Sequence, residues 1–214
     1  MMAFTPKMIS MLRPRIEELV DSLLDEVDVR KPCDLIEKFC GPLPATVICE
    51  MLGIPVEERD EFRVMTERVM HFSTAGGPNL KNHAEDATAA LGGLIAMFER
   101  LVVGRRETPR DDLLSALVQA EADGERLSND ELYAMCVFVF LAGHETTTNG
   151  IASGVMALLQ HPDQFALLKA DVDGVVRSTV EEVLRYESPV TRAVRKASDD
   201  MEFAGKKIQA GQLV

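Results

Sequence analysis

The feature that most constrains this chain is a long stretch without proline, from Ser128 to Gln160. At its start Ser128 and Glu131 have the spacing of a capping box, in which two side chains satisfy backbone amides at a helix N-terminus. The next proline is Pro162. The pattern predicts one helix over about residues 128–160, roughly 45 Å long at 1.5 Å per residue. Such a helix would cross an entire domain.

Apolar residues recur at helical spacing through most of the remaining chain, so we expect a mainly α fold. Pro6 stands at the first position of an amphipathic helix, and a second helix should begin near Leu43. Short alternating segments around Gly205 and Gly211 predict minor β structure, confined to the C-terminal end. Because no linker or repeat interrupts the pattern, we expect residues 1–214 to form a single partial domain.

Composition narrows the possible partners. The net charge of -12 would repel a nucleic acid backbone and an anionic lipid surface, so neither is an expected partner. The sequence shows no signal-peptide pattern and, by our reading of its apolar runs, no segment long enough for a membrane span, which predicts a cytoplasmic location. The cysteines lack CxxC spacing and indicate buried thiols in a reducing compartment, although a disulfide stays open; they are Cys33, Cys40, Cys49 and Cys136.

The most unusual stretch of the long predicted helix is AGHETTTNG, which starts at Ala142. Gly143 costs about 1 kcal/mol against alanine in a helix, and Glu145 and Thr146 are costly to bury without partners. Threonine can also bond a carbonyl one turn earlier and bend the helix. One interpretation is a helix opened beside a flat or bulky group, with a proton-donating pair at the opening. The other is a helix crossing, where small residues allow close approach.

His144 and Glu145 begin an HExxH pattern, in which two histidines bind zinc. The second histidine of that pattern is missing, since position 148 is Thr148. We therefore expect no metal ligands in this stretch.

A second motif is EEVLR, in which Glu182 and Arg185 stand three residues apart on one helical face. Together with AGHETT, the segment VEEVLRYESPVTRAVRKASDDMEFAGKKIQAGQLV and the N-terminal segment FTPKMISMLRPRIEELVDSLLDEV, it resembles the cytochrome P450 family, particularly its soluble bacterial members. The resemblance covers essentially the whole chain. It implies the central helical portion of the cytochrome P450 fold.

By this resemblance, Ala142 to Thr147 form the oxygen-binding turn across the distal face of a haem. Ala142 and Gly143 would contact the cofactor, while Glu145 and Thr146 would be the catalytic acid and alcohol that deliver protons to dioxygen. The chemistry suits these residue types, because cleavage of the O–O bond needs protons on that side while bulk water is kept out.

The resemblance also assigns roles later in the chain. Glu182 and Arg185 match a structural ion pair, and Arg195 matches the arginine that binds a haem propionate. A loop near Gly76 would join two helices that cover the pocket. The positions expected to line the substrate pocket are Phe138, Leu141, Val190 and Thr191.

The implied activity is haem-dependent monooxygenation of a small apolar molecule, using O2 and electrons from a separate ferredoxin or reductase. The family's iron is held by a cysteine thiolate in a loop after the EEVLR helix, and no cysteine here has that context. The chain also resembles the family without its N-terminal region, so we expect a central fragment, inactive alone. The alternative is a haem-free helical bundle with a structural or association role through exposed apolar surface.

Overall fold

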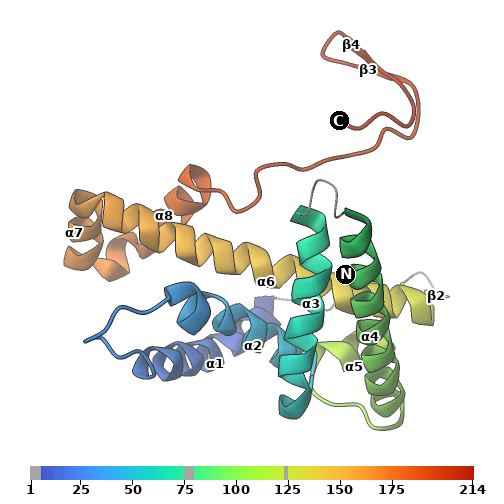
Figure 1. Cartoon of the computed structure of the whole chain (residues 1–214), viewed down its shortest axis with the longest axis horizontal. Coiled ribbons are helices and arrows are strands. Elements are labelled where there is room, and N and C mark those ends of the chain that lie inside the picture. The colour runs from blue at the N-terminus through green and yellow to red at the C-terminus, as the bar shows by residue number, and fades with distance from the viewer. Residues whose placement is uncertain (1–5, 75–79, 123–124) are drawn as a thin grey trace. The chain divides into compact units, whose positions relative to one another are not determined.

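A computed structural model describes residues 6–74, 80–122 and 125–214. The chain divides into two compact units, Met1–Ala152 and Ser153–Val214 (Figure 1). The first contains α1 (Pro6–Asp25), a π-helical turn (Ile36–Cys40), α2 (Pro42–Met51), a 3-10 turn (Val56–Glu58), α3 (Arg59–Thr74), α4 (Leu80–Glu107), α5 (Leu113–Gln119), β1 (Glu121–Ala122) and β2 (Glu125–Arg126). The helix α6 (Asn129–Gln160) runs from this unit into the second, which also holds α7 (Pro162–Ala170), α8 (Val172–Tyr186), β3 (Met201–Phe203) and β4 (Lys206–Ile208).

The mainly α fold class is confirmed, and α6 matches the predicted long helix to within one residue. Its N-terminus is a capping box. The Glu131 carboxylate accepts hydrogen bonds from the Ser128 backbone N–H at 2.9 Å and from the Ser128 hydroxyl at 2.8 Å, while the Glu131 N–H donates to Ser128 Oγ at 3.3 Å. These bonds lower the pKa of Glu131, because they stabilise its charged form. The expectation of a single domain over residues 1–214 stays a prediction.

The start of α2 is set by its prolines. Pro42 occupies the first helical position, where its missing N–H costs nothing, and the helix begins one residue before the predicted Leu43. The preceding π-helical turn ends at the buried Cys40. Gly53 follows the helix with φ +66°, a left-handed conformation that glycine adopts without strain.

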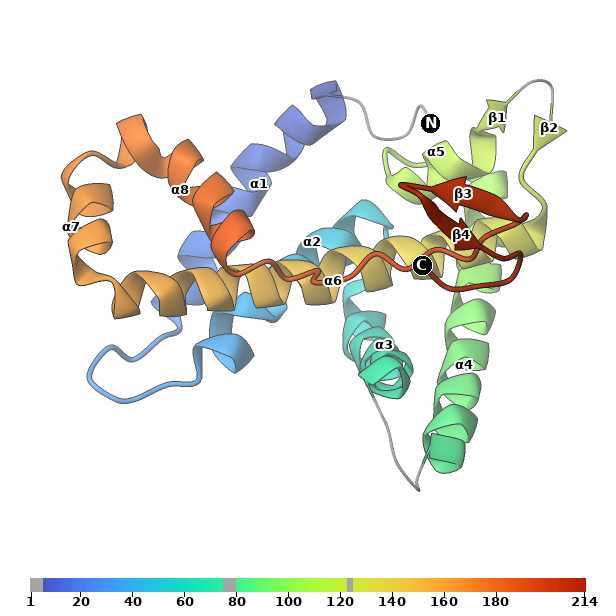
Figure 2. The same ribbon diagram turned by 90° about the horizontal axis from the view of Figure 1, so that it is seen from above.

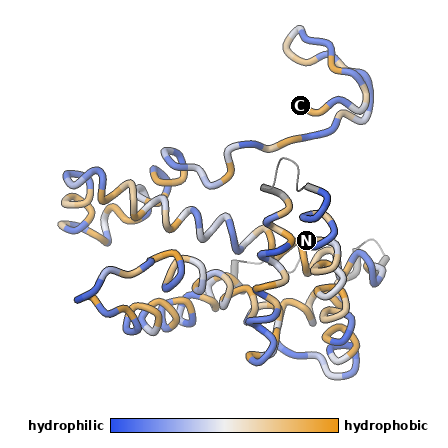
Figure 3. Tube along the Cα trace, viewed as in Figure 1, coloured by the Kyte–Doolittle hydropathy of each residue, from blue (hydrophilic) through white to orange (hydrophobic). Residues whose placement is uncertain are grey.

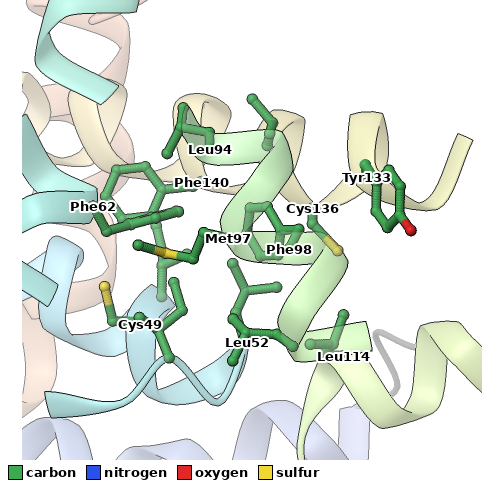
Figure 4. Packing of buried hydrophobic residues seen from close by; sticks show 14 of the residues in the cluster. Cys49, Leu52, Phe62, Leu94, Met97, Phe98, Leu114, Tyr133, Cys136 and Phe140 are labelled. Atoms are coloured by element: carbon green, nitrogen blue, oxygen red, sulfur yellow. The ribbon is translucent and has the colours of Figure 1, made fainter. Parts of the chain in front are cut away.

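The first unit has a core built by α2, α3, α4, α5 and α6. α3 packs along α4, and α4 also contacts α5. Hydrophobic and hydrophilic residues alternate along these helices, as an amphipathic helix requires (Figure 3). Figure 4 shows the rings and aliphatic side chains that interdigitate in this core. Fully buried members include Leu52, Phe62, Leu94, Phe98, Leu114 and Phe140.

One buried ion pair joins three segments of the first unit. Arg105 Nε, near the end of α4, donates to Asp112 Oδ2 at 2.6 Å, and Arg105 Nη2 donates to the Gly53 carbonyl at 2.8 Å. Asp112 also accepts the Ser115 N–H at 2.8 Å and so caps α5. Both charged side chains are almost completely buried, at 5% and 7% exposure. The end of α2, the end of α4 and the start of α5 are therefore held at one point.

In the second unit, α7 and α8 fold back beside the C-terminal end of α6 (Figure 2). A side chain on Gly154 of α6 would place its Cβ 2.9 Å from a methyl group of Val183, so this glycine allows α8 to approach closely. Further on, β3 and β4 pair as an antiparallel hairpin, in which Phe203 faces Lys206. Its turn residues Ala204 and Gly205 both have positive φ, which matches the twist of a two-residue hairpin.

Two expectations from the sequence were wrong. Strand structure is not confined to the C-terminal end, because β1 and β2 form a short antiparallel ladder before α6. A segment long enough for a membrane span also exists: within the described residues, one helix, Lys81–Glu107, passes by length and composition. That helix buries Ala90, Leu94 and Phe98 in the core, as core helices of globular domains do.

Candidate functional site

The AGHETT turn lies in the middle of α6, and the α-helix continues through it. Ala142 is exposed, whereas Glu145 and Thr146 are partly buried. The Thr146 hydroxyl donates to the Ala142 carbonyl at 2.7 Å, and the Thr148 hydroxyl donates to the His144 carbonyl at 2.9 Å. The threonines thus satisfy themselves on the helix, and the helix is not opened as one interpretation of the sequence expected.

Gly143 has a packing reason to be glycine. A Cβ at this position would lie 2.7 Å from Ile48 Cδ1 of α2, closer than non-bonded carbon atoms approach. This is the close approach that the helix-crossing interpretation described. Cofactor contact by Gly143 stays a prediction, since its missing side chain is already explained by α2.

An apolar cavity of about 390 Å³ lies between α4 and α6 within the first unit. Phe138, 65% exposed, and Leu141 line it, so the structure brings together two of the residues predicted to bind substrate. Ala142 is one helical turn beyond Phe138 on the same exposed side of α6. Sequence reasoning missed the opposite wall, although the i, i+4 spacing of two apolar residues in α4 could have indicated it. That wall is formed by Leu91 and Ile95.

In the second unit, Glu182 and Arg185 form the predicted ion pair. Arg185 Nε donates to Glu182 Oε2 at 2.7 Å and Nη2 donates to Oε1 at 2.6 Å, a bidentate geometry. The hydrogen bonds lower the pKa of Glu182 and raise that of Arg185. Both side chains are well exposed, at 60% and 69%, and stand one turn apart on α8. The pair is formed, and its structural role stays a prediction.

The remaining predicted site residues follow α8 in extended chain. Val190 is 55% exposed and Thr191 is exposed. Arg195 pairs with the C-terminal residue Val214 through two backbone hydrogen bonds, N to O at 2.8 Å and O to N at 2.9 Å. Its guanidinium donates to the neighbouring Val194 carbonyl at 3.0 Å and makes no ion pair within the described residues. Arg195 can therefore still bind a carboxylate.

A second cavity, of about 470 Å³, lies within the second unit and was not expected from the sequence. The end of α6, α7 and α8 line it with mostly apolar side chains. At its edge the Tyr186 hydroxyl and His161 Nε2 are 3.4 Å apart. Neither residue belongs to a recognisable sequence motif, so their contact could be found only in the folded structure.

The residues predicted for the distal face and for the propionate contact have the chemistry that a haem would need. Ala142 and Phe138 leave an exposed apolar stretch of α6 that a flat apolar ring can cover, and Arg195 has the charge that a propionate needs. Within the described residues, no group of three or more His, Cys, Asp or Glu side chains could hold a metal ion.

The three buried cysteines do not fit the axial thiolate. All four cysteines are free thiols. Cys40, Cys49 and Cys136 are buried as expected, whereas the expectation of burial was wrong for Cys33, which is exposed. Burial raises the pKa of Cys40, and raises the pKa of Cys49 and of Cys136 to about 12. Buried thiols of this kind stay protonated at neutral pH, so they do not offer the ligand that the family's iron requires.

Comparison with known proteins places these features in one family. The cytochrome P450 family model matches residues 1–214. The chain is 40% identical over 214 residues to the vitamin D(3) 25-hydroxylase of Pseudonocardia autotrophica, covering 99% of this chain and 51% of that protein. It is 42% identical over 217 residues to the cytochrome P450 monooxygenase PikC of Streptomyces venezuelae, covering 99% and 49%.

A solved structure gives the same result for the fold. CYP109E1 from Bacillus megaterium, in complex with testosterone, superimposes with a TM-score of 0.86 at 33% identity, covering 99% of this chain and 56% of that one. The chain spans about half the length of the curated relatives it matches. A match over the whole chain in sequence, together with the same fold, shows that the chain belongs to the cytochrome P450 family.

Proposed function

We propose that this chain supplies the proton-delivering helix and one wall of the substrate pocket of a haem-dependent monooxygenase. Its family and fold are those of haem monooxygenases in general. The observation that carries the proposal is the position of Glu145 and Thr146, which are adjacent and partly buried on α6, about one helical turn after Leu141, a residue that lines an apolar cavity.

The proposed chemistry divides between the cofactor and the chain. A thiolate-ligated haem, when bound, supplies the electron density that favours O–O cleavage. The chain's own part is to move protons. Thr146 keeps its proton on the Ala142 carbonyl, so its oxygen can accept a hydrogen bond from water, and rotation of the side chain would release the proton toward the open face. Glu145 is the proposed acid that replaces that proton.

The cavity between α4 and α6 supports an apolar substrate. Phe138, Leu141 and Leu91 offer apolar contacts there and would keep water from the reacting groups. Relatives point to the same class, since one is named a vitamin D(3) hydroxylase and another structure holds testosterone. We therefore propose a small apolar substrate, with electrons from a ferredoxin or reductase. The four free thiols support a reducing compartment such as the cytoplasm.

A chimera tests this proposal. The chain would replace the aligned half of the Streptomyces venezuelae relative, so that the other half supplies the axial cysteine. We expect the reduced, carbon-monoxide-treated chimera to show the red-shifted Soret band of thiolate ligation. Glu145→Gln should slow product formation about 10²-fold with substrate binding retained, whereas the exposed control Glu107→Gln should not. A folded chimera without that band, or equal turnover in the two variants, would contradict the proposal.

A second candidate role is association, favoured by the surface of α8. Four apolar residues at i, i+4 spacing are between 44% and 52% exposed, and no residue of α8 is buried; they are Val172, Val176, Val180 and Leu184. Contiguous exposed apolar surface of this kind usually drives association. We expect light scattering to show a dimer or larger oligomer that Val176→Lys with Val180→Lys dissociates. A monomeric wild-type chain at micromolar concentration would rule this role out.

A further inference from the structure

His144 lies inside the AGHETT turn, and the proposed chemistry does not use it. Its imidazole is partly buried and packs on the ring of Phe140, one helical turn earlier, with ring centroids 5.2 Å apart and planes tilted by 45°. The residues that follow it directly are Glu145 and Thr146. The orientation of this ring is therefore tied to the orientation of the proposed proton-delivering pair.

Phe140 is itself the end of a column of rings that crosses three helices. Phe62 of α3 meets Phe140 edge-on, with centroids 4.5 Å apart at 88°, and meets Phe98 of α4 edge-on at 5.6 Å and 89°. All three phenylalanines are fully buried, and Figure 4 shows Phe62 and Phe140 against each other within the core. Because protein interiors are close-packed, a ring in such a column cannot move unless its neighbours also move.

A second contact holds the same turn against α2. Gly143 lies against Ile48 of α2 so closely that no side chain fits between them. The Thr148 hydroxyl also bonds the His144 carbonyl at 2.9 Å, which fixes the helix one turn later. α6 therefore packs closely on α2 at Gly143, where no side chain intervenes, and on α3 through the contact between Phe140 and Phe62.

We propose that His144 is a positioning residue, which sets the rotation of Glu145 and Thr146 about the axis of α6 by packing at the end of the Phe98–Phe62–Phe140 column. The packing of His144 does not depend on the proposed function, whereas its effect on proton delivery rests on it. The column would also transmit a displacement of α3 or α4 to the AGHETT turn of α6. By family resemblance those two helices cover the pocket, although the loop near Gly76 lies outside the described residues.

The charge state of the imidazole agrees with a packing role. Burial lowers the pKa of His144 most strongly, with a smaller lowering from Arg63, while the Glu67 carboxylate, the Gly41 carbonyl and Glu145 partly oppose these effects. A neutral imidazole packs against Phe140 without the desolvation cost of a charge. A residue that shuttled protons here would instead need ready access to its charged form.

The experiment follows the Thr146 methyl signal by NMR in the 214-residue chain, which needs no haem. His144→Ala should shift this signal, and His144→Phe should restore it, because phenylalanine keeps a ring on Phe140 but carries no titratable nitrogen. The matched control is His161→Ala in the second unit, which should leave the signal unchanged. If His144→Ala leaves the Thr146 signal in place, or if Phe fails to restore it in a folded chain, the proposal is wrong.

A second arm tests transmission through the column. Phe62→Leu lies two rings away from His144 and should shift the Thr146 signal in the wild-type background, but much less when His144 is already alanine. Should Phe62→Leu fail to fold, Phe98→Leu perturbs the same column from its far end. If Phe62→Leu shifts the Thr146 signal equally with and without the His144 ring, then α3 affects the turn through other contacts, and the proposed coupling through His144 is wrong. Since no arm measures turnover, failure here is distinguishable from failure of the proposed monooxygenase.

Discussion

Arg105 and Arg185 each bind a carboxylate at short distance and differ in their exposure to water. The pair with Asp112 is buried, whereas the pair of Arg185 with Glu182 is solvent-exposed. Removing one partner of a buried pair leaves an uncompensated charge, so Arg105→Ala should lower the free energy of unfolding by about 3–5 kcal/mol. Arg185→Ala should lower it by a clearly smaller amount, because water screens the exposed pair, and a measurable loss is what its predicted structural role requires. Urea denaturation of both variants checks this, and equal losses would contradict it.

His144 should make stability depend on pH at the acid side. Its pKa is lowered in the folded state from an ordinary value of 6.5, so the unfolded chain binds the proton first as pH falls. Stability should therefore be lost below about pH 6.5 and show no contribution from this group above it. The difference in melting temperature between wild type and His144→Phe, followed from pH 8 to pH 5, isolates the effect because the other histidines are common to both. A pH-independent difference would contradict the burial of this imidazole.

At the scale of elements, the crossing of α6 and α2 depends on the pair Gly143 and Ile48. Gly143→Ala gains about 1 kcal/mol in helix propensity but places a Cβ 2.7 Å from Ile48 Cδ1. Ile48→Val removes that methyl group. We expect the change in the free energy of unfolding caused by Gly143→Ala to be clearly more favourable in the Ile48→Val background than in the wild type. Urea denaturation of all four proteins measures it. The same effect in both backgrounds would show that the two helices do not meet as described.

The elements that carry their own signals could be predicted from the sequence. The capping box of Ser128 and Glu131, with Pro162 beyond, placed α6 correctly because both are local features of the chain. The short ladder of β1 and β2 was missed, since two-residue strands have no periodicity to detect. The expectation that no segment is long enough for a membrane span was also wrong, because the helix Lys81–Glu107 has that length and composition.

The residues of the candidate site could be proposed from the sequence, but the contacts that surround them could not. Spacing and resemblance selected Phe138, Leu141 and the turn after them, and the structure places the first two in one cavity. The reason for Gly143 could not be read from the sequence, because Ile48 is nearly a hundred residues away and nothing in the local pattern links them. The cavity edged by His161 and Tyr186 was missed for the same reason.

At the scale of the whole molecule, the chain alone should bind haem without thiolate ligation. Its buried cysteines have raised pKa values, to about 12 for Cys49 and Cys136, and stay protonated. After haem addition, reduction and carbon monoxide treatment, the spectrum should therefore lack the red-shifted Soret band that thiolate ligation produces. Appearance of that band in the isolated chain would mean that one of its four cysteines has been recruited to iron.

Thr146 is proposed to deliver protons to dioxygen, and the chimera with the Streptomyces venezuelae relative allows one direct measurement of this role. The quantity is the ratio of hydrogen peroxide to product formed per reducing equivalent. Thr146→Ala should raise this ratio several-fold while substrate binding is retained, because binding precedes the step that needs the proton. Thr148→Ala is the matched control, since its hydroxyl bonds a carbonyl one turn earlier in the same way, and it should leave the ratio unchanged. An unchanged ratio in Thr146→Ala, or an equal rise in both variants, would contradict the account.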